Sequence, residues 1–331
     1  MYNVFRKLAS VVVRPFNKDL SRRLRKKPSP VEPVRNDLDG RFTELSKYLA
    51  DSLDVLCGRQ SALSASVDVL LRRVYFPLDS RRALIRTQVG YMICDRKDAS
   101  LIAMLIESGE LEPGLRLFLS RFLDEGMHFV DVGAHIGMHS IAAARIVGAN
   151  GRVFSFDATP DNADFLRQNV IQNGFVDRVV VHECFVGAAA GVTDFHICPI
   201  SGLNSKFPVP NETGHLKLPV VALDEMLREV GNIDLFKIDV EGAEVAVFAG
   251  MRGLMRRIPS ACVVAEFAAI HLKRSGSRIE DWEAFCKEHG LSVFEVGESD
   301  GNLRSTSFLE LMSKETANVL MARGTRFKNC L

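Results

Sequence analysis

Apolar residues in the second half of the chain form short, unbroken runs separated by amphipathic segments. From residue 128 the strand-like runs read HFVDVG, GRVFSFDA, RVVVHECFVG, IDLFKIDV, ACVVAEFA and LSVFEV, and helix-like segments such as TPDNADFLRQNVIQNG and EVAVFAGMRGLMRRI lie between them. Strands that are apolar on both faces and alternate with helices are typical of a parallel sheet buried between helical layers. The pattern predicts a doubly wound, mostly parallel α/β domain over residues 128–331, with ligands at the carboxyl ends of its strands.

Residues 41–76 carry a different period. Their seam positions recur in alternating steps of four and three, with two polar exceptions, through Phe42, Ser46, Leu49, Leu53, Leu56, Gln60, Leu63, Val67, Leu70 and Val74. A period of about 3.5 residues, sustained over several heptads, favours a coiled-coil helix. We expect a homo-oligomer that pairs through residues 42–74, and the alternative is a helix folded back on the α/β domain.

Three other segments complete the expected organisation. Residues 1–40 are basic and contain prolines, which predicts a disordered tail with at most weak attraction to an anionic membrane surface. Residues 77–127 hold one strand-like run, YMICD, and two helix-like runs, DASLIAMLIESG and PGLRLFLSRFLDEG, and are expected to pack on the α/β domain. A Pro- and Gly-rich insertion at about residues 190–220 is predicted to be a lid or a substrate wall.

Composition narrows the class of protein and its setting. Hydrophobic residues make up 47% of the 331 residues and the formal net charge is +1, so no global positive field points to nucleic acid as a partner. The seven cysteines are odd in number and show no C-x-x-C spacing, which argues against a disulfide framework and a structural zinc site. No apolar stretch reaches the roughly 18 residues of a membrane span. We therefore expect a cytoplasmic protein.

The run FVDVGAHIGMHS ends a predicted strand in a turn that suits one kind of ligand. Gly133 allows a tight turn, and Gly137 lets the next helix pack closely. The dinucleotide fingerprint G-x-G-x-x-G would place a second glycine where His135 stands, and Asp131 would repel a diphosphate. The motif therefore favours a cationic or zwitterionic ligand without phosphates.

Asp157 ends the next predicted strand and adds a second requirement. It follows Gly133 by 24 residues, which is near the spacing of about 20 that places a carboxylate on ribose hydroxyls. The alternative is an acid that serves the dipole of the following helix. A ligand with a ribose, a positively charged group and no phosphate describes S-adenosylmethionine.

A second cluster of acids stands in DLFKIDVEGAE. Asp239, at the end of that strand, is predicted either to accept a substrate hydroxyl proton or to orient the amino group of the cofactor. Glu241 is a further catalytic candidate, whereas Glu244 fits an acid in a first helical turn. Glu266 ends the next strand among apolar residues, where a carboxylate is costly unless it is used or paired, so it is either catalytic or ion-paired with Lys237.

Together these motifs resemble the FkbM family of S-adenosylmethionine-dependent methyltransferases, over about residues 128–300. DVGAHIGMHS resembles the family's D-V-G-A-N-x-G-x-x-S, and IDLFKIDVEGAEVAVFAGM resembles its more specific K-I-D-V-E-G-x-E signature. The resemblance implies methyl transfer to oxygen, often on sugars or natural-product hydroxyls. His135 departs from the usual asparagine, and Ala158-Thr159 replaces a Glu-Pro ending, so the ribose contact rests on Asp157.

The site predictions follow from these motifs. The predicted cofactor-binding residues are Asp131, Gly133, Ala134, His135, Gly137, Asp157, Ala158, Cys184 and Asp239. The predicted catalytic residues are Asp239, Glu266 and Glu241, with His139 as an outside candidate for the base. No metal is predicted, although the same three carboxylates offer the oxygen ligands of a metal-assisted reaction.

The acceptor is expected to bear a hydroxyl, and the polar side chains of Ser201 and Asn204 in the insertion favour a glycan. Two rival hypotheses belong to other classes of function. A nicotinamide-dependent oxidoreductase would need a phosphate cradle that the sequence lacks. A non-catalytic scaffold would use the coiled coil and leave the acids at the strand ends without a role.

Overall fold

The computed structural model describes residues 75–209 and 211–323, together with isolated helical positions between residues 44 and 61. The basic tail and every position of the heptad series lie outside the described residues, so the coiled coil and its self-pairing stay predictions. The chain divides into two units, Met1–Val67 and Asp68–Leu331, and the elements below belong to the second. Within the described ranges, no helix has both the length and the apolar character needed to cross a membrane.

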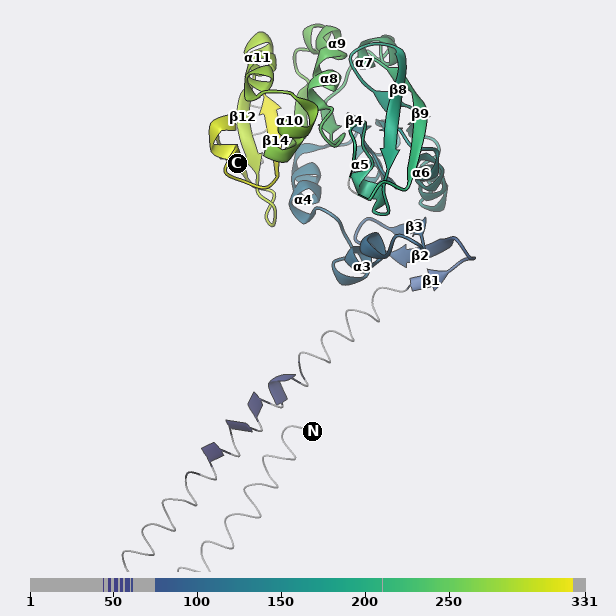
Figure 1. The fold of residues 1–331 in the computed structure, drawn as a ribbon, viewed down its shortest axis with the longest axis vertical. Coiled ribbons are helices and arrows are strands. Elements are labelled where there is room, and N and C mark those ends of the chain that lie inside the picture. The colour runs from purple at the N-terminus through teal and green to yellow at the C-terminus, as the bar shows by residue number, and fades with distance from the viewer. Residues whose placement is uncertain are drawn as a thin grey trace, which may run out of the picture. The chain divides into compact units, whose positions relative to one another are not determined.

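An eight-stranded sheet in the order β13-β12-β14-β11-β10-β4-β5-β6 carries the fold (Figure 1). The strands are β4 His128–Val132, β5 Arg152–Asp157, β6 Val179–Glu183, β10 Leu235–Ile238, β11 Cys262–Phe267, β12 Ser292–Val296, β13 Leu303–Ser305 and β14 Ala317–Ala322. Five neighbouring strands, β11, β10, β4, β5 and β6, are parallel to one another. Strand β14 runs antiparallel to both β11 and β12. The predicted α/β fold with a mostly parallel sheet is confirmed.

Helices cover both faces of this sheet, so its central strands are buried on both sides. In β4, Phe129 packs in one hydrophobic cluster and Val130 in the other, and Leu235 and Phe236 divide in the same way in β10. One cluster includes side chains of α4 Pro113–Phe122, α5 Met138–Val147 and α6 Pro160–Gln172. The other includes side chains of α7 Leu223–Met226, α8 Glu244–Ala249, α9 Arg252–Arg257, α10 Ala269–Ser275, α11 Ile279–His289 and α12 Phe308–Leu311. This double burial explains the unbroken apolar runs of the sequence.

Two predicted elements are divided in the structure. The single helix expected over EVAVFAGMRGLMRRI is wrong, because α8 ends before Gly250, where the backbone approaches the Gly187 carbonyl so closely that a Cβ would lie 2.1 Å from its oxygen. The single strand expected over RVVVHECFVG is also wrong. It separates into β6 and β7 Phe185–Val186, and the amide of Cys184 between them donates to the Asp157 carbonyl at 3.0 Å.

The insertion forms a small sheet of its own. β8 Gly191–Ile197 and β9 Gly214–Val221 pair antiparallel, and β7 joins β9 in parallel, which gives the order β7-β9-β8. The chain between β8 and β9 includes a short 3-10 turn, Ser201–Leu203. This segment supplies one wall of the cleft described below.

The entry segment contains more strand than its sequence indicated. β1 Tyr75–Pro77, β2 Arg82–Arg86 and β3 Tyr91–Asp95 form an antiparallel sheet, of which only β3 was predicted, and α3 Ala99–Glu107 and α4 follow as expected. Asn169 of α6 fixes this sheet by accepting from the Ile93 amide at 2.5 Å and donating to the Ile93 carbonyl at 3.0 Å. The same amide group donates to the Ile136 carbonyl at 2.8 Å, so the sheet is tied to the turn after β4.

Candidate active site

The turn after β4 is held by backbone contacts and depends on two glycines. The amides of Gly133 and Ala134 both donate to the Phe156 carbonyl at 2.9 Å. Gly133 has a φ of +79°, and a Cβ on it would lie 1.7 Å from the Asp239 carbonyl oxygen. Gly137 has a φ of +92°, and its Cβ would meet the Leu166 side chain at 2.2 Å. Only glycine both adopts a positive φ without strain and leaves the space of a Cβ empty at these positions.

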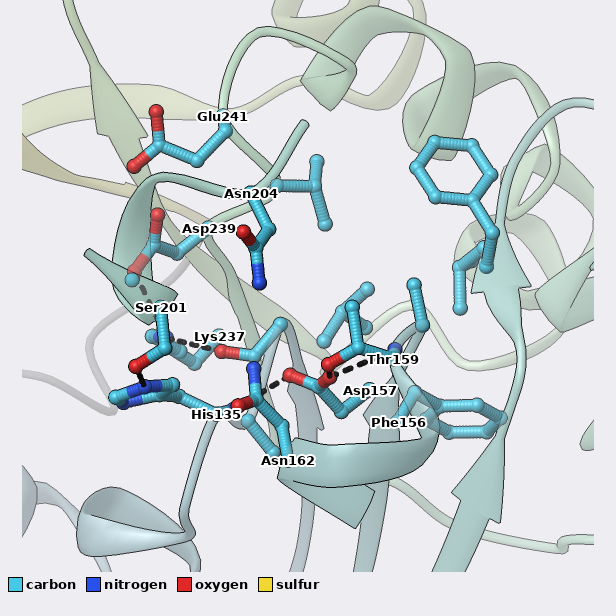
Figure 2. A pocket seen from close by; sticks show the side chains of 18 of the residues that line it. His135, Phe156, Asp157, Thr159, Asn162, Ser201, Asn204, Lys237, Asp239 and Glu241 are labelled. Atoms are coloured by element: carbon cyan, nitrogen blue, oxygen red, sulfur yellow. Dashed lines mark hydrogen bonds and ion pairs between the residues drawn. The ribbon is translucent and has the colours of Figure 1, made fainter. Parts of the chain in front are cut away.

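Asp157, at the end of β5, is a buried carboxylate aimed at this turn (Figure 2). One oxygen accepts from the Thr159 amide at 3.0 Å and from its hydroxyl at 2.9 Å, and the other accepts from the His135 amide at 2.8 Å. Burial raises the pKa of Asp157 to about 6, in spite of these hydrogen bonds. The remaining lone pairs of the Asp157 carboxylate can accept hydrogen bonds from hydroxyl groups of a ligand in the cleft.

His135 links the glycine turn to the insertion. Its backbone has a φ of +51°, its Nε2 lies 2.6 Å from the Ser201 hydroxyl, and that hydroxyl donates to Asp98 at 2.6 Å. Because the serine gives its only proton to a carboxylate, Nε2 is the donor toward the serine. Burial lowers the pKa of His135 to about 4, so the ring is neutral at pH 7.

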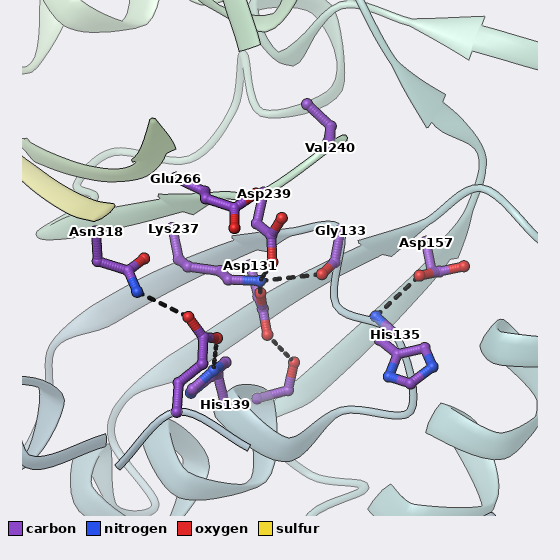
Figure 3. A network of polar contacts seen from close by, with 12 residues as sticks. Asp131, Gly133, His135, His139, Asp157, Lys237, Asp239, Val240, Glu266 and Asn318 are labelled. Atoms are coloured by element: carbon purple, nitrogen blue, oxygen red, sulfur yellow. Dashed lines mark hydrogen bonds and ion pairs between the residues drawn. The ribbon is translucent and has the colours of Figure 1, made fainter. Parts of the chain in front are cut away.

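A buried triad of charges lies beneath the turn (Figure 3). Lys237 Nζ contacts Asp239 at 3.1 Å, the Gly133 carbonyl at 3.1 Å and Asp131 at 3.6 Å, and Ser140 donates to Asp131 at 2.6 Å. Burial alone would lower the pKa of Lys237, but the neighbouring carboxylates raise it. Asp131 is fully buried and does not line the cleft, so here it neutralises Lys237. Of the two alternatives for Glu266, the ion pair with Lys237 is not formed, because Lys237 lies in register with Asp131 on β4 and contacts Asp131 and Asp239.

Asp239 lines the cleft from the end of β10. Burial raises its pKa, although the charge of Lys237 opposes that shift. A second carboxylate, Glu112, lines the cleft near the glycine turn, where it contacts His139 Nε2 at 2.7 Å and accepts from Asn318 at 2.7 Å. His139 is therefore occupied by Glu112, and sequence reasoning missed this pair because it joins segments far apart in the chain.

Glu241 and Glu266 meet across a histidine that the sequence did not single out. His271 Nε2 lies 3.2 Å from Glu241, and its Nδ1 lies 3.5 Å from Glu266. Arg274 contacts the same Glu241 carboxylate at 3.1 Å. Thr316 donates to the other oxygen of Glu266 at 2.8 Å. Burial and the charges of Asp239 and Glu241 raise the pKa of Glu266 to about 9, so it is protonated at pH 7.

Glu241, Glu266 and His271 also form the group that could hold a metal ion among the described residues, with ligand atoms within 4.8 Å of one another. The imidazole already bridges the two carboxylates. Burial alone would lower the pKa of His271, but the hydrogen bond and charge of Glu241 raise it. The Nδ1 atom of His271 and the facing oxygen of Glu266 are buried, and neither has a hydrogen-bond partner among the described residues.

The cleft gathers most of the predicted residues. Seven of the nine predicted cofactor-binding residues line it, namely Gly133, Ala134, His135, Asp157, Ala158, Cys184 and Asp239. Gly137 and Asp131 lie behind them. Of the predicted catalytic residues, Asp239 and Glu241 line the cleft and Glu266 does not. Phe156 and Asn162 also line it and were not predicted.

These residues fit an adenosyl group that carries a positive charge. Asp157 offers carboxylate oxygens to the ribose, and the apolar side chains of Phe156 and Cys184 lie beside it. At the other side of the turn, Asp239 supplies the negative charge that a sulfonium or ammonium group requires. The turn has no second glycine for a diphosphate, since His135 occupies that place. The fold and this cleft define an α/β domain of the class that binds S-adenosylmethionine.

Comparison with known proteins gives the family. Residues 131–293 match the methyltransferase FkbM domain. The resemblance seen in the sequence is thereby confirmed.

Curated relatives match shorter segments. Hexuronic acid methyltransferase AglP of Haloferax volcanii is 29% identical over 130 residues, covering 39% of this chain and 51% of that protein. A protein-L-isoaspartate O-methyltransferase of Hyperthermus butylicus is 28% identical over 88 residues, covering 24% of this chain and 32% of that protein. The chain thus spans about half the length of the first and a third of the second.

Among solved structures, fibrillarin of Aeropyrum pernix with natively bound S-adenosylmethionine aligns at 13% identity and a TM-score of 0.37, covering 76% of this chain and 99% of that one.

Proposed function

We propose that the protein is an S-adenosylmethionine-dependent O-methyltransferase that acts on a hydroxyl group, with a sugar hydroxyl as the favoured acceptor. The observation that carries the proposal is the buried Asp157 carboxylate facing the glycine turn, with Asp239 and Glu241 on the same cleft. Ser201 and Asn204 add polar groups from the insertion. A relative named as a hexuronic acid methyltransferase supports a sugar as acceptor.

Different residues of the chain bind the cofactor and accept the proton. When bound, S-adenosylmethionine supplies a methyl group activated by the neighbouring sulfonium. Gly133, Ala134, Asp157, Ala158 and Cys184 hold the adenosyl part, and alignment of donor and hydroxyl supplies about 7–11 kcal/mol of barrier reduction in well-oriented reactions.

Asp239 is the first choice for the base. Burial raises its pKa above the ordinary value of an aspartate, which makes it a stronger base toward an alcohol. Glu241 is the second choice because its carboxylate already binds His271 and Arg274. Glu266 lies behind His271 and acts by positioning that ring.

Ligand-dependent melting of the full chain tests the cofactor. We expect S-adenosylhomocysteine to raise Tm and NAD to leave it unchanged, since a ligand at 100 times its Kd adds about 2.7 kcal/mol to the stability of the folded state. Stabilisation by NAD alone would favour the oxidoreductase, and stabilisation by neither would favour the scaffold.

The base is tested by Asp239→Asn, with labelled methyl donor and fractionated cell glycans. Loss of a general base typically lowers turnover about 10²–10⁴-fold. Full turnover with unchanged affinity for S-adenosylhomocysteine would remove Asp239 from that role, and Glu241→Gln would then be the next variant.

A further inference from the structure

A second cavity of about 420 Å³ adjoins the cofactor cleft. The segment between β8 and β9 forms one side, and α10 forms the other. Its apolar wall consists of Pro199, Ile200, Leu203, Val209 and Ile270. The volume falls within the range of about 300–1,000 Å³ that is usual for small-molecule sites.

Glu241 belongs to both cavities and so marks where they meet. Its φ is +54°, a left-handed conformation that costs a non-glycine residue free energy. Its carbonyl is held in place by the Ser205 hydroxyl at 2.9 Å and by the Arg274 guanidinium. A strained residue held by two donors at a junction of cavities indicates that its position matters for the ligand.

The polar groups of the second cavity gather at this same end. His271 and Arg274 line it beside Glu241. Arg274 Nε is buried and has no hydrogen-bond partner among the described residues, so one donor of this guanidinium is left unsatisfied. The opposite wall is aliphatic, and Leu203 and Ile270 are 46% and 61% exposed at its edge. A sugar alone would leave that wall without a partner.

We propose that this cavity receives the apolar part of the methyl acceptor. The acceptor is then amphipathic, a sugar carried on an aliphatic aglycone, with its hydroxyl in the cofactor cleft beside Asp239 and its hydrocarbon against the aliphatic wall. This inference rests on the proposed function for the hydroxyl end. Chain length of the aglycone, rather than the sugar alone, then sets affinity.

The test uses methyl, butyl and octyl β-D-glucosides as probes, titrated below micelle-forming concentrations into the full chain saturated with S-adenosylhomocysteine. We expect calorimetry to show binding that tightens at least tenfold from butyl to octyl, because each added methylene leaves water. Ile270→Asp places a charge on the aliphatic wall at a half-open position, and we expect it to abolish the chain-length dependence. Ile270→Leu should retain it.

Leu309→Asp is the matched control, since Leu309 is 77% exposed on α12 and lines neither cavity. Equal affinity for butyl and octyl glucoside, or an equal loss in Leu309→Asp and Ile270→Asp, would overturn the proposal. Binding of S-adenosylhomocysteine is measured separately in each variant. Its absence would count against the proposed function, whereas its presence with no chain-length dependence would count against this cavity alone.

Discussion

The turns after β4 and β10 stand side by side on neighbouring parallel strands, yet they are built in opposite ways. The turn after β4 presents backbone to the cleft, and its acid, Asp131, is buried and neutralised. The turn after β10 presents the carboxylates of Asp239 and Glu241. The turn after β4 is suited to binding a ligand by its shape. The turn after β10 is suited to binding a positive charge and to accepting a proton.

The two turns are also coupled. The missing Cβ of Gly133 leaves room for the Asp239 carbonyl, and Lys237 joins Asp131 beneath one turn to Asp239 in the other. The turn after β4, which binds the cofactor, and the turn after β10, which carries the carboxylates, therefore cannot be altered independently. Variants in one turn are expected to change the other.

Gly133→Ala should have the largest effect on the site, because it is expected to abolish cofactor binding as well as to lower stability. A left-handed backbone at alanine costs about 1–2 kcal/mol, and overpacking against the Asp239 carbonyl adds about 1–3 kcal/mol. We expect denaturant unfolding to show that combined loss and binding of S-adenosylhomocysteine to disappear. Gly202→Ala is the control, because Gly202 lines the same cleft with no atom within 4 Å of a Cβ. Equal behaviour of the two variants would disprove the coupling.

Lys237→Met should come next, since it breaks the link between the turns. Removing one partner of a buried ion pair costs about 3–5 kcal/mol, because the other charge is left unpaired. We expect the free energy of unfolding to fall by that amount. Lys217→Ala, at an exposed contact with Asp194, should cost less than about 1 kcal/mol. A Lys237 variant as stable as the Lys217 variant would show that the triad is not a structural link.

The pH dependence of cofactor binding separates the ribose contact from the rest of the site. Ionised Asp157 accepts hydroxyl donors, and its pKa is raised to about 6. Affinity for S-adenosylhomocysteine should rise from pH 5 to pH 7 with a midpoint near 6. His135, with a pKa of about 4, stays neutral in this window. Titration calorimetry of Asp157→Asn should give weaker binding without that midpoint, and a midpoint that persists would assign it elsewhere.

The raised pKa of Asp157 also makes the stability of the ligand-free protein depend on pH, and this stability falls with rising pH where the affinity for the cofactor rises. The folded state holds the Asp157 proton more tightly than the unfolded chain, whose pKa is near 3.8. Its contribution to stability is therefore present below pH 3.8 and is lost as pH rises through about 6. Melting in Asp157→Asn should lack this component.

The smallest effect is expected from chelation. The mechanism proposed above uses Asp239 as the base and needs no metal at Glu241, Glu266 and His271, so methyl transfer should be unchanged in excess EDTA. Loss of turnover in EDTA that Mg²⁺ or Mn²⁺ restores would show that the second turn carries a metal.

The sequence predicted best what depends on neighbouring residues. Gly133, Asp157 and Asp239 stand directly at strand ends, and parallel strands bring their carboxyl ends to one edge. The partner of Lys237 depended on which strands are adjacent, and that order cannot be obtained from a local pattern. Arg274 and His271 were missed because an ordinary helical segment, α10, carries them, and nothing local marks their approach to Glu241.

The same limit applies to the fold. Runs that are apolar on both faces predicted the parallel strands, because double burial leaves a mark in the sequence. β14 was missed, since ANVLMA is short and lies at the end of the described chain. RALIR was missed because two of its five residues are arginine, although it is the central strand of its sheet and only two of its residues are buried.

The position of β14 has a consequence for the order of assembly during synthesis. It fills the gap between β11 and β12, both of which leave the ribosome earlier. Its segment also delivers Thr316 to Glu266 and Asn318 to Glu112. Until those residues emerge, the nascent chain lacks the strand between β11 and β12, and Glu266 and Glu112 lack these two hydrogen-bond donors, so the sheet and the polar network beside the cleft are completed only after the segment of β14 has left the ribosome.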